Sequence, residues 1–273
     1  MSQLSFTKLS PNDRPVERWL LVLHGIMGTK ANWQSMARKI VDAVDGWGAV
    51  LVDLREHGDS KGFAPPHTVL AAASDLLALD AELDAPIEGV LGHSFGGKTA
   101  IAYAGLQPHA KKVIVVDASP SQRLGMNAPD SVTAVIDTLV DLPKEFENRN
   151  AFVHAVVAAG HSQATAAWLA MNLRRRADGS REFNLDLNVM RALLADYAQT
   201  DFWNAIEAPH SGQLFMFIVG DRSDVVSGAD LARLRPLEAT GEVRVVHADA
   251  GHWVHVDAPE LVLQSAIGFL ADR

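Results

Sequence analysis

Two hydrophobic patterns alternate along the chain. Short apolar runs rich in β-branched residues predict strands at 18–24, 49–53, 87–91, 113–117, 214–219 and 243–247. Longer segments with apolar residues every three or four positions predict helices at 31–44, 67–83, 95–106 and 258–271. The run 18–24 is too apolar for a half-exposed strand, so we expect a central strand covered on both faces. The alternation predicts an α/β fold with a mostly parallel central sheet flanked by helices.

The strand pattern stops in the second third of the chain. Between residues 119 and 211 we find only helical periodicity, at 130–142, 144–159, 162–175 and 187–199. Loops longer than ~15 residues are uncommon in compact domains, so this interval is too long to be a loop. We therefore predict a core formed by residues 1–118 and 211–273, and a helical cap (lid) at 119–210, inserted between two late strands.

Composition fits one globular domain with such an insertion, since 48% of the 273 residues are hydrophobic. The stretch 151–173 has no charged residue and is long enough to cross a bilayer. Polar residues recur through it, however, and Arg174 to Arg176 follow it. We therefore expect two helices that meet at Gly160, and no membrane span.

Charge and cysteine content exclude several functions. The net charge of −9 offers no basic surface for a phosphate backbone, so nucleic acid is not an expected partner. The absence of cysteine excludes disulfides, thiolate zinc sites and a cysteine nucleophile. The N-terminal residues lack the features of a secretory signal, which predicts a cytoplasmic protein. Nothing in the sequence indicates an oligomeric state.

The strongest chemical signal is Gly92-His-Ser-Phe-Gly96, which follows the predicted strand 87–91 and precedes a helical segment. A serine in a sharp strand-to-helix turn has strained backbone angles, and glycines beside it prevent collisions with neighbouring backbone. The hydroxyl of Ser94 is then exposed. This setting is typical of the nucleophile elbow of the α/β-hydrolase fold, whereas the same letters elsewhere would be an ordinary glycine-rich turn.

A second motif, His24-Gly-Ile-Met-Gly28, lies at the end of the first central strand. Attack by a serine on an acyl carbon moves negative charge onto the carbonyl oxygen, which needs fixed hydrogen-bond donors. We predict that the backbone N–H groups of Ile26 and Phe95 form this oxyanion hole.

The general base is expected late in the chain, because this fold orders its triad as nucleophile, acid and histidine. Ala250-Gly-His-Trp253 follows the last predicted strand, so we favour His252 over its neighbour His255. His24 and His93 are expected to line the site without catalysing.

Three aspartates compete for the acid. Many hydrolases of this fold carry it in a Gly-x-x-Asp turn after the cap, but here that turn reads Gly220-Asp-Arg-Ser223. Asp117 instead ends the strand before the cap, and its carboxylate would reach the same edge of the sheet. We favour Asp117, with Asp224 and then Asp221 as alternatives.

Five motifs fall in order along the chain. They are His24-Gly-Ile-Met-Gly28, Asp53-Leu-Arg-Glu-His-Gly-Asp-Ser60, Gly92-His-Ser-Phe-Gly-Gly-Lys98, Val116-Asp-Ala-Ser-Pro120 and Ala250-Gly-His-Trp253. Together they resemble the small α/β-hydrolase esterases related to bacterial acyl-ester and thioesterase-like hydrolases and to the mitochondrial abhydrolase-domain proteins. The resemblance implies a triad of Ser94, a carboxylate and His252, hydrolysis of short to medium acyl esters, and no cofactor or metal. It also supports an acid before the cap, because these relatives lack the aspartate that Ser223 replaces.

The sequence thus predicts a serine carboxylesterase whose substrate is a small acyl ester or thioester. Carbon–carbon bond hydrolysis, perhydrolysis and a ligand-binding module with little turnover remain as alternatives. Six residues are expected to contact the substrate: His24, Met27, His93, Trp168, Phe202 and Trp253.

Overall fold

A seven-stranded sheet forms the centre of the molecule in the computed structural model, which describes residues 3–123 and 132–272. The order of the strands is β1-β3-β2-β4-β5-β9-β10, and all except β1 are parallel. Their bounds are β1 Phe6–Leu9, β2 Arg18–Leu23, β3 Trp47–Val52, β4 Ile87–His93, β5 Lys112–Val116, β9 Leu214–Gly220 and β10 Val243–Ala248. The carboxyl ends of β2, β4, β5 and β10 therefore meet at one edge, where ligands bind in open α/β sheets.

Helices cover both faces of this sheet, which explains its apolar strands. One face packs against α2 (Val69–Leu76), α3 (Phe95–Leu106) and α9 (Gly228–Glu238). The other packs against α1 (Gln34–Ala43) and α11 (Pro259–Ala271). Three short helices complete the core: η1 (Lys30–Trp33), η2 (Leu77–Ala81) and α10 (Val254–Asp257).

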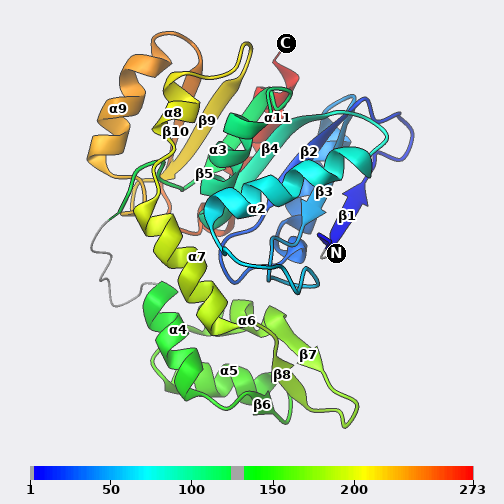
Figure 1. Cartoon of the computed structure of the whole chain (residues 1–273), viewed down its shortest axis with the longest axis vertical. Coiled ribbons are helices and arrows are strands. Elements are labelled where there is room, and N and C mark those ends of the chain that lie inside the picture. Colours follow the sequence, from blue (N-terminus) through cyan, green and yellow to red (C-terminus); the bar gives the residue numbers. More distant parts are fainter. Residues whose placement is uncertain (1–2, 124–131, 273) are drawn as a thin grey trace.

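The segment between β5 and β9 forms a lobe beside the carboxyl edge, except at its end, where the short helix α8 (Trp203–Glu207) packs against α3 (Figure 1). Its helices are α4 (Val132–Asp141), α5 (Arg149–Ala158), α6 (Gln163–Leu169), η3 (Ala170–Asn172), α7 (Leu187–Gln199) and α8 (Trp203–Glu207). Apolar side chains of this segment, such as Ile136, Phe152 and Leu193, continue the hydrophobic cluster of the core. We call the lobe, from α4 to α7, the cap.

The cap is not entirely helical, contrary to the sequence prediction. It contains a three-stranded antiparallel sheet of β6 (Glu145–Phe146), β8 (Arg181–Phe183) and β7 (Leu173–Arg175). The helix predicted at 162–175 ends at Leu169, and the chain becomes extended at Leu173. Gly179 adopts φ +90° between β7 and β8 and so permits the hairpin. Strands of two or three residues are too short to produce a recognisable period in the sequence.

Other boundaries differ from the predictions in smaller ways. Helix α2 begins at Val69 rather than at residue 67, because the Thr68 hydroxyl accepts the N–H of Ala71 and caps it. The strand β1 and the helices α8 and α9 were not predicted. The first two residues of the helix predicted at 130–142 lie outside the described residues.

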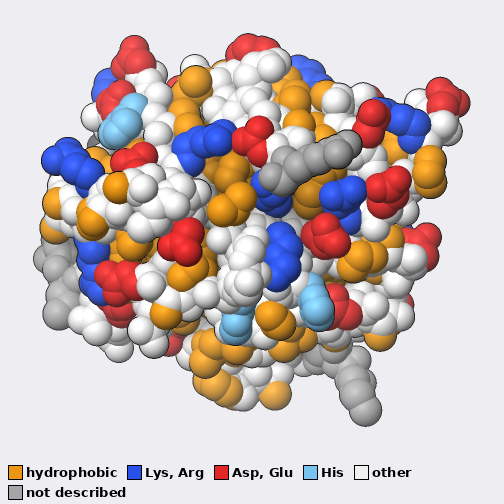
Figure 2. Space-filling view, turned by 90° about the horizontal axis from the view of Figure 1, so that it is seen from above, with side chains coloured by type: hydrophobic (Ala, Val, Ile, Leu, Met, Phe, Trp, Pro, Cys, Tyr) orange, Lys and Arg blue, Asp and Glu red, His pale blue; other side chains and the backbone are white. Residues whose placement is uncertain are grey.

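None of the helices in the described ranges has the length and hydropathy needed to cross a bilayer. On the face opposite the cap, acidic and basic side chains are interspersed with apolar ones (Figure 2). This mixed face contrasts with the concentrated positive charge of a phosphate-binding surface.

Candidate active site

Ser94 lies between β4 and α3, in the turn predicted from the sequence. Its backbone has φ 55° and ψ −119°, a conformation that side-chain-bearing residues rarely adopt. A Cβ atom on Gly92 would lie 2.1 Å from the carbonyl oxygen of Gly96, and one on Gly96 would lie 2.4 Å from that of His24. The two glycines therefore allow the turn to close against the end of β2 and present the Ser94 hydroxyl at the sheet edge.

His252 joins Ser94 to Asp117. Its Nε2 is 3.0 Å from Ser94 Oγ, and its Nδ1 is 2.7 Å from Asp117 Oδ2. A carboxylate can only accept, so Nδ1 carries the proton and Nε2 accepts from the serine hydroxyl. The structure thus brings together the three residues predicted as nucleophile, base and acid, from the ends of β4, β10 and β5.

Asp117 is fully buried, at φ 45° directly after β5. Besides His252, the backbone N–H of Gly220 donates to Oδ1 at 3.1 Å and the Ser223 hydroxyl donates to Oδ2 at 2.5 Å. Ser223, which occupies the place of the usual acid, therefore binds the carboxylate that lies before the cap. The sequence singled out Ser223 but did not predict this contact.

The structure does not bring the alternative residues into the same arrangement. Asp221 is exposed and contacts His247 Nδ1 at 2.8 Å, while Asp224 is exposed. His255 stacks on Trp33 with ring centroids 4.6 Å apart. Burial, followed by the nearby His252, lowers the pKa of His255 to about 4.

The loop after β2, residues 24–28, carries the predicted oxyanion donor, and two of its N–H groups are already used. The N–H of Met27 donates to His57 Nε2 at 3.0 Å, and that of Gly28 donates to the Gly25 carbonyl at 2.9 Å. None of the hydrogen bonds between described residues uses the N–H of Ile26. Phe95 is the first residue of α3, whose N–H has no acceptor within its own helix.

Two buried histidines tie this loop to the loop after β3. His24 Nδ1 donates to the Gly25 carbonyl at 2.7 Å, and its Nε2 accepts from the N–H of Leu54 at 3.1 Å. His57 Nδ1 donates to the carbonyl of Arg55 at 2.9 Å, while its Nε2 accepts from Met27. Burial lowers the pKa of both rings, and a neutral ring is what each pair of contacts requires. The motif 53–60 contained His57, but its role was not predicted.

Of the six residues expected to contact substrate, two line a cavity of about 480 Å³. The rings of Trp168 from α6 and Trp253 meet edge to face, with their centroids 4.8 Å apart. The apolar side chains of Met36 and Leu263 also line the cavity. The cavity therefore lies between α1, the cap and the loop that carries His252.

The other four expected residues do not line this cavity. His24 and Met27 are buried in the loop after β2. The Nε2–H of His93 donates to the carbonyl of His252 at 2.9 Å, and burial lowers the pKa of His93 well below its usual value. The ring of Phe202 packs, half-buried, against the core.

Lys98, at the first turn of α3, is fully buried. Its Nζ donates to the carbonyl of Ser121 at 2.8 Å and to that of Tyr197 at 2.6 Å. Ser121 lies on the segment that leads into the cap, and Tyr197 lies in the last turn of α7. In the part of the chain that the structure describes, no group of three or more His, Asp or Glu side chains could hold a metal ion.

Comparison with known proteins gives matches over most of the chain. Residues 20–265 match the model of the Alpha/beta hydrolase family. The sn-1-specific diacylglycerol lipase ABHD11 of Mus musculus is 30% identical over 92% of this chain and 80% of its own length. The esterase YbfF of Escherichia coli K12 is 28% identical over 93% of each chain.

A solved structure of an esterase from a marine microorganism resembles this one with a TM-score of 0.82. It is 24% identical in sequence, and the match covers 98% of this chain and all of that one. At this identity the likeness concerns the fold.

Proposed function

Because the chain belongs to the alpha/beta hydrolase family and is a hydrolase of ester bonds, we propose that Ser94, His252 and Asp117 form its catalytic triad. The observation that carries this proposal is the continuous hydrogen-bonded chain from Ser94 Oγ through both nitrogens of His252 to Asp117. Such a chain activates a serine hydroxyl that is otherwise a weak nucleophile.

In the first half-reaction, Ser94 Oγ bonds to the acyl carbon while His252 Nε2 takes the hydroxyl proton. The tetrahedral intermediate collapses when its bond to the alcohol oxygen breaks, and His252 returns the proton to that oxygen. In the second half-reaction, water attacks the acyl-enzyme while His252 takes its proton. The bond between the acyl carbon and Ser94 Oγ then breaks, His252 returns the proton to Oγ, and the carboxylic acid leaves. Asp117 orients the ring and stabilises its cationic form in both halves.

Negative charge on the carbonyl oxygen is stabilised in this scheme by the N–H groups of Ile26 and Phe95. Their proposed role is supported by the engagement of Met27 and Gly28 elsewhere, which leaves the N–H of Ile26 for the substrate.

The substrate class that we propose is an ester with a short to medium acyl chain. The support for this class is a cavity of about 480 Å³, a volume within the range of about 300–1,000 Å³ that small-molecule sites have. Its walls are partly apolar, and it reaches Trp253, the residue after His252, although Ser94 and His252 do not line it. The name of the mouse relative adds an acylglycerol to the esters worth testing.

The test compares wild type with Ser94→Ala on p-nitrophenyl butyrate. We expect kcat to fall by at least about 10³-fold, because loss of a triad member leaves only the contributions of the oxyanion hole and of binding. A fluorophosphonate should label wild type at Ser94 and leave the variant unlabelled.

Two further variants serve as a matched pair. Asp117→Asn should also lose most activity, whereas Asp224→Asn should retain it. Hydrolysis by Ser94→Ala at the wild-type rate would contradict the proposal, as would an active Asp117→Asn beside an inactive Asp224→Asn.

A further inference from the structure

The backbone of Met27 is held from two sides. Its φ of 57° is unfavourable for a residue with a side chain, so neighbouring groups must maintain it. Its N–H donates to His57 of the core, and its carbonyl accepts from the Nδ2 of Asn172, at 2.8 Å. Asn172 belongs to the cap. The residue that follows the proposed oxyanion donor is therefore fixed jointly by the core and the cap.

Asn172 is itself firmly placed. Its residue is 4% exposed and lies at the end of η3. The Nδ2 also contacts the carbonyl of Leu169 at 3.4 Å, and the backbone carbonyl of Asn172 accepts from the N–H of Asn184 at 3.1 Å. Contacts with α6 on one side and with the segment after β8 on the other thus hold the amide against Met27.

The neighbouring residue makes a second contact with the same region of the core. Met171 Sδ accepts from Asn32 Nδ2 at 3.2 Å, and Asn32 Oδ1 accepts from the N–H of Thr29 at 2.6 Å. Thr29 directly follows the loop of residues 24–28. The cap therefore contacts this loop at Met27 and also contacts, through Asn32, the residues that directly follow the loop.

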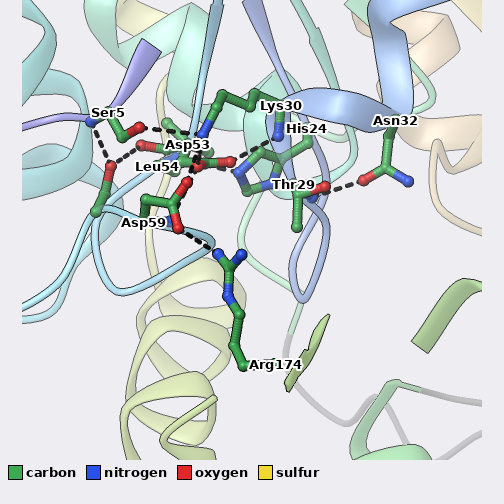
Figure 3. A network of polar contacts seen from close by, with 10 residues as sticks. Ser5, His24, Thr29, Lys30, Asn32, Asp53, Leu54, Asp59 and Arg174 are labelled. Atoms are coloured by element: carbon green, nitrogen blue, oxygen red, sulfur yellow. Dashed lines mark hydrogen bonds and ion pairs between the residues drawn. The ribbon is translucent and has the colours of Figure 1, made fainter. Parts of the chain in front are cut away.

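A different contact links the same part of the cap to the loop after β3. Arg174 pairs with Asp59, which shares the ammonium of Lys30 with Asp53 (Figure 3). Arg174 does not contact residues 24–28 directly. It therefore offers a control that weakens the attachment of the cap without removing the hydrogen bond to Met27.

We propose that Asn172 is a positioning residue for the oxyanion hole, because its hydrogen bond from the cap to Met27 keeps the N–H of Ile26 aimed correctly. This inference rests on the proposed function of Ser94. Without the amide, the buried Met27 carbonyl loses its donor, and the peptide between Met27 and Gly28 can turn, while the peptide before Met27 stays held by His57. The N–H of that peptide between Met27 and Gly28 donates to the Gly25 carbonyl, and the Gly25–Ile26 peptide carries the Ile26 N–H, which then moves from the position where the oxyanion forms.

Asn172→Asp is the sharpest test, because it keeps the shape of the side chain and replaces the donor with an acceptor. On p-nitrophenyl butyrate we expect kcat to fall by about 10- to 100-fold, with KM within about twofold of wild type. A misaligned oxyanion donor gives this pattern, because the donor stabilises the charge that develops in the transition state. Asn172→Ser, whose hydroxyl is too short to reach Met27, should give the same direction of change and serves if Asn172→Asp does not fold.

A trifluoromethyl ketone, which forms a tetrahedral oxyanion with the serine, gives a readout that looser folding alone would not produce. Its inhibition constant should rise in parallel with the fall in kcat, whereas that of the matching methyl ketone should not change. Arg174→Gln should leave kcat and both constants within about twofold of wild type.

An unchanged kcat in the Asn172 variants would overturn the inference, as would an equal loss in Arg174→Gln. Failure of the proposed function is read separately, from wild type against Ser94→Ala. If that pair shows ester hydrolysis at Ser94, the Asn172 variants decide on the positioning role alone.

Discussion

Two of the attachments between the cap and the core use similar chemical groups in very different surroundings. The first attachment lies where the chain enters and leaves the cap, a region that we call the root. Here the fully buried Lys98 donates to the carbonyls of Ser121 and Tyr197. At the far side of the cap, Arg174 pairs with Asp59 through side chains that are 47% and 55% exposed. One attachment is shielded from water and the other is open to it.

The root also contains the buried carboxylate of Asp230, which accepts hydrogen bonds at both of its oxygens. Asp230 accepts from the hydroxyls of Ser119, Ser121 and Ser227, and from the N–H of Ser227. Trp203 Nε1 in turn donates to Ser121 Oγ at 2.7 Å. A buried polar network costs free energy if any member loses its partner, whereas exposed groups recover hydrogen bonds from water. We therefore expect the root to hold the cap on the core. The exposed ion pair between Arg174 and Asp59 should contribute little to the free energy of unfolding.

The largest effect should come from Lys98→Met. The side chain keeps most of its volume, but one buried and one part-buried carbonyl lose their donor, so we expect the free energy of unfolding to fall by about 2–4 kcal/mol. Lys111→Met is the matched control, because Lys111 Nζ also donates to one carbonyl, that of Ser211, but in an exposed position. Urea unfolding of both variants measures the difference, and equal losses would show that burial is not what distinguishes the root.

A smaller, pH-dependent effect should follow from the same lysine. Burial lowers the pKa of Lys98 from 10.5 to about 8, so between these values the unfolded chain binds more protons than the folded one. The free energy of unfolding of wild type should therefore rise with pH over this window, relative to Lys98→Met. A neutral amine still has two N–H groups for its two carbonyls, so deprotonation leaves the attachment intact.

Urea titrations at a pH of about 8 and of about 10 test this sign. A gap between wild type and Lys98→Met that narrows as the pH rises would contradict it.

The smallest effect should come from Arg174→Gln. Exposed ion pairs contribute about 0–1 kcal/mol and are screened by salt, so the loss of stability should be small and should vanish at about 1 M sodium chloride. A loss comparable to that of Lys98→Met would mean that the two attachments are equivalent.

The core was predictable from the sequence because its strands are long, apolar and separated by amphipathic helices. The six parallel strands were all predicted, with boundaries within a few residues, and the motifs at their ends were brought to one edge. The edge strand β1 was missed, because its residues Phe6–Leu9 show mixed burial and no continuous apolar run. The strands of the cap have only two or three residues each. They are therefore too short to show an alternation of apolar and polar residues in the sequence.

The candidate site shows a similar division. That Ser94, Asp117 and His252 lie together at one edge of the sheet was predictable from strand ends and chain order, which depend on local motifs. The contacts of His57, Asn172 and Ser223 were not found, since each joins residues far apart in the sequence, such as Asn172 and Met27. A hydrogen bond of this kind depends on tertiary packing and leaves no spacing signal in one sequence.

The ammonium group of Lys98 binds the carbonyls of both Ser121 and Tyr197. The chain therefore enters the cap and returns from it at neighbouring positions on the core. Two chain segments that lie so close together can be joined by a short linker, and insertions at such points are well tolerated. The whole segment can therefore be lengthened, shortened or exchanged between homologues without moving a strand. Replacement of the cap would leave Ser94, Asp117 and His252 where the sheet puts them, but a new cap would also have to supply the donor that Asn172 gives to Met27.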